Sequence, residues 1–229
     1  MKNYLFYLFL LLTFSCSSTK EKFLNPEEES PDVYKVLFDN EDVKVLEVIF
    51  APGQSDNMHD HHPMTIHVIK GGKVQGTLPD GTVSEREIPD GFTGHQAKGV
   101  RHQMKNIGNN EMKILLIEEK KTRPKTKVNE NFLHPESTSP DIYEILLENE
   151  HVKVMMVTFE AGEGDQMHDH NPMTFHVIQG GKAKVTMPDG TVNEREIPSG
   201  FTGYNSEGQR HQVTNIGNSQ VRILLVEHS

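Results

Sequence analysis

The sequence predicts an all-β protein made of two tandem domains with the same architecture. The first observation is an internal repeat: Met58–His61 reads Met-His-Asp-His, as does Met167–His170, and the offset is 167 − 58 = 109 residues. The second is a series of short β-rich runs bounded by turn residues, of which Val43–Phe50 and Lys113–Glu118 are examples. Many short strands at regular spacing, with no long stretch of helical period, are typical of a β-sandwich or a closed β-barrel.

Turn signals separate the predicted strands. Asp-Gly lies between two strand-like runs at Asp80–Gly81 and again at Asp189–Gly190, and this dipeptide favours a tight hairpin. The Gly-Gly pairs at 71–72 and 180–181 mark a further turn in each copy. Each repeat is therefore expected to fold as its own unit of about 90 residues, which can bury a modest core if its strands close on themselves.

The repeat boundaries define the predicted domain organisation. The stretch Lys120–Lys127 is basic, contains a proline and has no apolar period, so we interpret it as a solvated linker. Turn-forming residues at Pro135–Pro140 lead into the second copy. The predicted segments are a signal peptide at 1–15, a lipidated cysteine with a flexible tether at 16–30, a first domain at 31–119, a linker at 120–139 and a second domain at 140–229.

The N-terminus predicts export and lipid anchoring. Lys2 precedes the apolar run Tyr4–Phe14, which is shorter than the roughly 20 residues that a transmembrane helix needs and is typical of a secretory signal. The run Thr13–Cys16 resembles a bacterial lipobox, and lipidation of Cys16 would hold a water-soluble body at the cell envelope. The alternatives are an ordinary signal peptide with an incidental cysteine, or an uncleaved anchor. Cys16 is the one cysteine of the chain, so the fold needs no disulfide.

Composition narrows the possible partners. The 229 residues carry a net charge of −10 without any long basic stripe, which argues against nucleic acid and anionic lipid as ligands. The expected partner is a small-molecule ligand or substrate, and the membrane is reached through the lipid anchor alone. The oligomeric state stays open, because the two repeats could pack against each other as an internal pseudo-dimer.

Four histidines recur with the repeat and predict two metal sites, because histidine is the commonest protein ligand for transition metals. Residues two apart on a strand face the same side, so His59 and His61 point together, and His67 shares their parity. His102 lies in a later strand run and joins them only if the sheet closes. The same set recurs as His168, His170, His176 and His211.

At these residues each repeat resembles a cupin domain, and the pair resembles a bicupin. In the first copy Gly53 precedes His59 and His61 at the spacing of the first cupin motif, and Gly72 supplies its later glycine. The second cupin motif is matched by Gly99, His102 and Asn106. The second copy repeats both motifs with Gly162, His168, His170, Gly181, Gly208, His211 and Asn215. The resemblance implies two jelly-roll β-barrels, each with one bound metal ion.

The sequence departs from the cupin pattern at one ligand. Thr65 and Thr174 occupy the place of the usual glutamate, and we expect His67 and His176 to supply a fourth imidazole instead. A set of three or four nitrogen donors suits a divalent transition metal, namely Zn, Fe, Cu, Ni or Co, better than Mg or Ca. Without the fourth imidazole, a three-histidine site keeps the open position that catalytic metals need.

The resemblance implies a metal-dependent enzyme of dioxygenase, isomerase or lyase type that acts on a small oxygenated substrate. The metal would polarise a carbonyl or activate water or oxygen. His95 and Tyr204 are the candidates for a general base. The alternatives are a non-catalytic module that binds a metal or a small ligand at the membrane surface, and a scaffold in which the metal stabilises each barrel.

Overall fold

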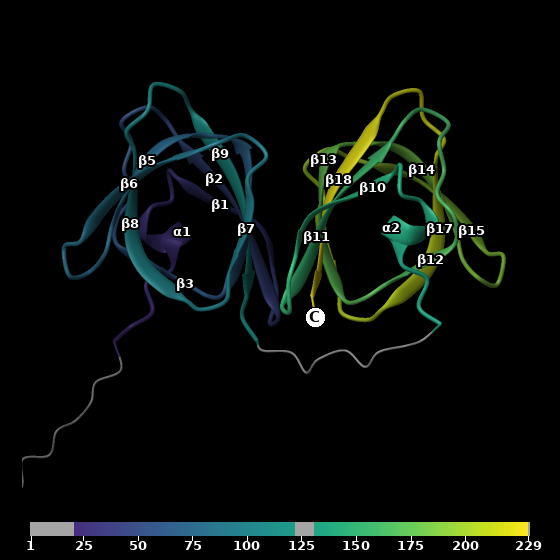
Figure 1. Ribbon diagram of the computed structural model, residues 1–229, viewed down its shortest axis with the longest axis horizontal. Coiled ribbons are helices and arrows are strands. Elements are labelled where there is room, and N and C mark those ends of the chain that lie inside the picture. The colour runs from purple at the N-terminus through teal and green to yellow at the C-terminus, as the bar shows by residue number, and fades with distance from the viewer. Residues whose placement is uncertain (1–20, 122–130, 229) are drawn as a thin grey trace, which may run out of the picture.

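The computed structural model describes residues 21–121 and 131–228 and confirms the predicted all-β fold of two jelly-roll barrels (Figure 1). The predicted signal peptide and Cys16 lie outside the described residues. Within the described ranges, no helix has the length and apolar character required to cross a membrane.

The first barrel consists of two antiparallel sheets. A five-stranded sheet has the order β1-β2-β9-β4-β7, and a four-stranded sheet has the order β3-β8-β5-β6. The elements are α1 (Pro26–Glu29), β1 (Tyr34–Asp39), β2 (Val43–Phe50), β3 (His59–His61), β4 (Met64–Lys70), β5 (Gly72–Thr77), β6 (Val83–Ile88), β7 (Thr93–Gln96), β8 (Val100–Asn106) and β9 (Met112–Glu119).

The second barrel repeats this topology strand for strand. Its sheets have the orders β10-β11-β18-β13-β16 and β12-β17-β14-β15. The elements are α2 (Pro135–Thr138), β10 (Tyr143–Glu148), β11 (Val152–Phe159), β12 (His168–His170), β13 (Met173–Gln179), β14 (Gly181–Thr186), β15 (Val192–Ile197), β16 (Thr202–Asn205), β17 (Gln209–Asn215) and β18 (Val221–His228).

The predicted hairpins connect β5 with β6 and β14 with β15. Gly81 and Gly190 have φ values of +83° and +84°, a left-handed conformation that glycine adopts without steric cost. The Asp80 carboxylate accepts a hydrogen bond from the backbone N–H of Thr82 at 2.9 Å and closes the turn. These local signals fix the position of the turn, and hence the register of the strands that line the cavity described below.

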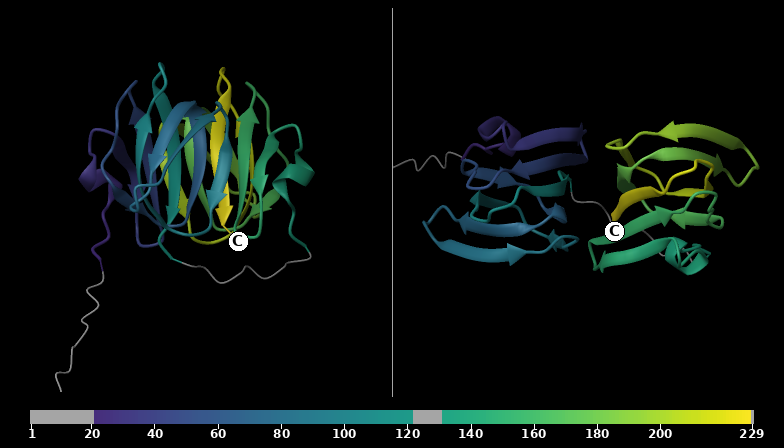
Figure 2. Two further views of the ribbon diagram at one scale, coloured as in Figure 1. Left: turned by 60° about the vertical axis from the view of Figure 1, so that its left-hand side comes forward. Right: turned by 90° about the horizontal axis from the view of Figure 1, so that it is seen from above.

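The two barrels pack back to back through their five-stranded sheets (Figure 2). Alternate residues of these strands point either into their own barrel or towards the other barrel. On β9, Leu116 belongs to the core of the first barrel, whereas Leu115 and Ile117 pack between the barrels. Their partners in this shared cluster include Val154, Leu224 and Val226. The repeats therefore form an internal pseudo-dimer around a common apolar layer.

Each folded unit begins earlier than the sequence boundaries predict. The backbone N–H of Asp60 donates to the Leu24 carbonyl at 2.8 Å, and the Asn57 N–H donates to Ser30 Oγ at 2.8 Å. The segment from Leu24 to Ser30, assigned to the tether from its composition, is therefore packed against β3. The residues before the second barrel are likewise packed against β12, because the Asp169 N–H donates to the Leu133 carbonyl at 2.8 Å.

Candidate metal centres

Three of the four recurring histidines meet inside each barrel. His59 and His61 project from the same face of the short strand β3, and the antiparallel register of β3 with β8 sets His59 opposite His102. One ring nitrogen of each lies within 4.8 Å of those of the other two. His168, His170 and His211 form the same cluster on β12 and β17. We refer to these two clusters as the histidine triads.

Hydrogen bonds from Nδ1 turn the Nε2 lone pairs inward. His59 Nδ1 lies 2.7 Å from the Asn57 carbonyl oxygen, which can only accept, so this nitrogen carries the proton. His61 Nδ1 donates to the carboxylate of Glu118. The two Nε2 atoms point towards each other at 2.8 Å. Each can offer a lone pair to a cation when it carries no proton. The arrangement fits a bound metal ion.

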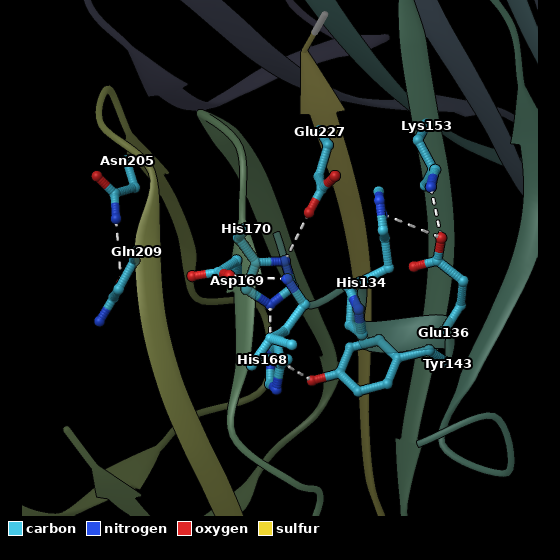
Figure 3. A network of polar contacts seen from close by, with 12 residues as sticks. His134, Glu136, Tyr143, Lys153, His168, Asp169, His170, Asn205, Gln209 and Glu227 are labelled. Atoms are coloured by element: carbon cyan, nitrogen blue, oxygen red, sulfur yellow. Dashed lines mark hydrogen bonds and ion pairs between the residues drawn. The ribbon is translucent and has the colours of Figure 1, made fainter. Parts of the chain in front are cut away.

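Glu118 and Glu227 hold the middle histidine of each triad. Figure 3 shows the equivalent contact in the second barrel, where His170 Nδ1 donates to Glu227 Oε1 at 2.7 Å. A carboxylate on the far nitrogen fixes the orientation of a ligating imidazole and raises its basicity. The sequence analysis missed these residues, although 227 − 118 = 109 is the repeat offset and would have revealed them.

A tyrosine and an aspartate complete each centre. Tyr34 Oη donates to Asp56 Oδ2 at 2.8 Å and lies 3.1 Å from His59 Nε2. Burial raises the pKa of Asp56 to about 6, and burial together with Asp56 raises the pKa of the Tyr34 hydroxyl well above its usual value. The hydroxyl therefore stays protonated at neutral pH. The same contacts recur at Tyr143, Asp165 and His168, and Figure 3 shows the tyrosine beside the imidazole.

The outer histidines of each triad are held neutral. Burial, followed by the neighbouring His61, lowers the pKa of His59 to about 4 and that of His102 to about 3. His168 and His211 have pKa values lowered to about 4 and about 3 by the same two causes, with His170 as the neighbour. A neutral imidazole offers the lone pair that a metal requires. His211 Nδ1 is moreover buried without a hydrogen-bond partner among the described residues.

The aspartate between the two histidines points out of the barrel. Arg101 donates to both carboxylate oxygens of Asp60 at 2.8 Å, through Nε and Nη2. This bidentate pair connects β8 to β3 on the side opposite the triad. Arg210 and Asp169 repeat the pair at 2.7 Å and 2.6 Å.

The expectation that His67 and His176 supply a fourth ligand is wrong. Neither histidine belongs to the triads, and His67 Nδ1 is instead hydrogen-bonded to Thr93 Oγ1 at 2.9 Å. Strand parity does not carry over from β3 to β4, because the chain changes sheets between them. On β4, Ile66 faces the cavity, so His67 faces the other barrel. His176 is held in the same way by Thr202 at 2.8 Å.

A cavity opens beside each triad. It has a volume of about 210 Å³ in the first barrel and about 530 Å³ in the second. Most of the lining is apolar, and Phe92 or Phe201 stands half-exposed in the wall. His95 and Tyr204, the candidates for a general base, line the first and the second cavity respectively.

One arginine adds a positive charge to each cavity. Arg195 lies on β15 opposite Ala183, a buried residue of β14, and cross-strand partners share a face of the sheet. The guanidinium lies close enough to His211 to help lower its pKa. Arg86 takes the same place beside His102. Each centre therefore combines imidazole ligands, an apolar cavity and one cationic group.

Comparison with known proteins gave structural matches alone. No family model matches the sequence, and no curated protein matches it. Oxalate decarboxylase from Bacillus subtilis superposes with a TM-score of 0.57 at 16% identity, over 82% of this chain and 68% of that one. AerE from Microcystis aeruginosa gives a TM-score of 0.58 at 13% identity, over 86% of this chain and 97% of that one.

A shorter match covers a single repeat. A cupin domain from Bordetella pertussis is 28% identical over 39% of this chain and 93% of that one, with a TM-score of 0.36. The two longer matches show that this chain has their fold, and at such low identity they show the fold alone.

The position of His67 leads to a prediction. The double variant His67→Ala, His176→Ala should keep the metal content of the wild-type chain, because neither side chain points towards a triad. The matched double variant His61→Ala, His170→Ala should lose metal from both barrels. Elemental analysis by mass spectrometry after dialysis against a weak chelator measures both. Loss of metal from the first double variant would instead support His67 and His176 as metal ligands.

The carboxylate behind His170 leads to a second prediction. In a chain whose first triad is removed by His59→Ala and His61→Ala, the substitution Glu227→Gln should weaken metal binding about 10- to 100-fold, as observed for outer-sphere partners of ligating histidines. Competition with a chromophoric chelator measures the affinity. Glu194→Gln, at an exposed residue of β15, is the control and should leave the affinity unchanged. Equal affinities in the two variants would show that the carboxylate does not support the ligand.

Proposed function

We propose that the protein is a metal-dependent enzyme of dioxygenase, isomerase or lyase type, acting on a small oxygenated and anionic substrate. The main observation is the convergence of three imidazoles in each barrel, two of which line an apolar cavity. Three protein ligands leave positions open for a substrate or water, as in catalytic metal sites. All-nitrogen donors favour a divalent transition metal, one of Zn, Fe, Cu, Ni or Co.

The metal and the residues around the triad would activate the substrate, bind its charge and exclude water. When bound, the metal would polarise a carbonyl or activate water or oxygen. Arg195 supports an anionic substrate, because this exposed arginine lines the cavity and its charge helps to lower the pKa of His211. The Tyr143 hydroxyl lines the same cavity and stays protonated at neutral pH, and it donates its proton to Asp165, which fixes the hydroxyl beside His168. The apolar wall excludes water from the reacting groups.

A non-catalytic binding module is the second candidate. The observation in its favour is that both repeats keep the complete triad together with its tyrosine, aspartate and glutamate. A duplicated enzyme can lose one of its two centres without losing activity, whereas a binder that uses both sites keeps them. Turnover distinguishes the two candidates, since a binder shows metal-dependent affinity without product.

The test begins with the metal content of untagged protein purified without added metal. Two equivalents per chain are expected, one for each triad. The loaded protein is then incubated with a panel of small hydroxy- and oxo-carboxylates, with and without oxygen, and consumption is followed by NMR. Metal-dependent consumption supports the enzyme. Metal-dependent binding without consumption by any member supports the binding module instead. Failure to bind metal even after reconstitution would overturn both.

We also infer from the sequence that the protein is exported and anchored to the bacterial envelope by lipid on Cys16. The support is the short apolar run that ends in Thr13–Cys16. Cells fed an alkyne-tagged palmitate should label the wild-type chain in the membrane fraction, whereas Cys16→Ser should abolish the label. Equal labelling of both chains would refute the anchor, and Ser17→Ala serves as the control.

A further inference from the structure

The two cavities differ in size although the strands around them are equivalent. The second cavity measures about 530 Å³ and the first about 210 Å³. The strand pairing is the same in both barrels: β5 sets Gly76 opposite Met104 on β8, and β14 sets Val185 opposite Val213 on β17. The difference therefore comes from side chains rather than from the path of the backbone.

Met104 is one of the side chains that line the smaller cavity. It follows His102 by two residues on β8, so both face the interior of the barrel. Its Sδ lies only 3.2 Å from where a Cβ on Gly76 would be, so the thioether lies across β5. Val213, at the same place in the second barrel, is short and β-branched and stays close to its own strand. In the second barrel Val185 stands in the place of Gly76, so two short side chains face each other beside the triad.

The rim of the second cavity is also built from larger residues. Phe175, Tyr204 and Gln209 line it, where the first barrel has Ile66, His95 and Val100. Gln209 accepts a hydrogen bond from the Asn205 side chain at 3.1 Å, and Figure 3 shows this pair at one side of the triad. Two aromatic side chains in this wall suit a ligand with a flat apolar body.

We propose that the two centres select ligands by size: the second barrel accepts an anion with an aromatic or branched apolar body, and the first accepts small anions alone. We assign the difference to the facing pair beside each triad, which is Gly76 and Met104 in the first barrel and Val185 and Val213 in the second. A volume of 530 Å³ falls within the range of about 300–1,000 Å³ typical of small-molecule sites, and 210 Å³ falls below it. This inference rests on the proposed metal-dependent function and assigns a ligand class to each centre.

The test uses the full-length chain loaded with Co²⁺, whose visible spectrum responds to a ligand at an open position. Each barrel is observed alone by removing the other triad, with His59→Ala and His61→Ala or with His168→Ala and His170→Ala. Azide is the small probe and benzoate the large one. Azide should perturb both single-site chains. Benzoate should bind the chain that keeps the second triad at least about tenfold more tightly than the other.

Reciprocal substitutions then test the residue itself. In the chain that keeps only the second triad, Val213→Met should weaken benzoate binding about tenfold through overpacking, while azide binding stays unchanged. Val192→Met, at a residue of β15 that is 51% exposed, is the matched control and should change neither. In the chain that keeps only the first triad, Met104→Val should strengthen benzoate binding. This second variant tests the size selection if Val213→Met does not fold.

The outcomes separate this inference from the proposed function. Equal benzoate affinity in the two single-site chains, or no effect of either reciprocal substitution, would overturn the size selection while leaving a metal-binding protein. Cobalt bound in both chains with no response to azide would show closed centres and overturn the proposed function together with the inference.

Discussion

The hydrogen bond between an imidazole and a buried carboxylate is the interaction on which each centre depends. His61 belongs to the four-stranded sheet and Glu118 to the five-stranded sheet, so this contact crosses the interior of the barrel. It orients the middle ligand and holds the two sheets at a fixed separation. Glu118 is also flanked on β9 by Ile117, which packs against the other barrel. The ligand geometry is thereby connected to the layer that joins the repeats.

Each barrel maintains an unusual concentration of buried polar groups. The triad, its tyrosine and two carboxylates all lie in or next to an apolar core, where an unpaired charge would be costly. The structure limits this cost by keeping the outer imidazoles neutral and by giving Asp56 a hydroxyl and a backbone N–H as donors. A divalent cation bound by the triad would use the lone pairs that these buried nitrogens offer. Metal binding and stability of the barrel are therefore expected to be coupled.

The sequence was sufficient for the fold and for the histidines that meet, because both leave a periodic signal. Alternation across β3 correctly placed His59 and His61 together, and the repeat doubled the evidence. The same reasoning failed at His67, because parity holds only within one strand and the chain crosses from one sheet to the other after His61. Glu118 recurs as Glu227 at the repeat offset and could have been predicted, but it lies in an otherwise apolar run. The packing of Met104 over Gly76 could not be predicted, because no periodicity in the sequence encodes that contact.

The strand that carries two ligands of each centre is short and lies at the edge of its sheet. β3 has only three residues, and its free side is covered by the segment around Leu24, which exchanges hydrogen bonds with the backbone and carboxylate of Asp60. In the second barrel the covering segment is the end of the interdomain connection, at Leu133. The connection thus has a mechanical role besides joining the barrels. A displacement of Leu133 would act directly on the backbone between His168 and His170, so the end of the connection and the geometry of the second centre are not independent.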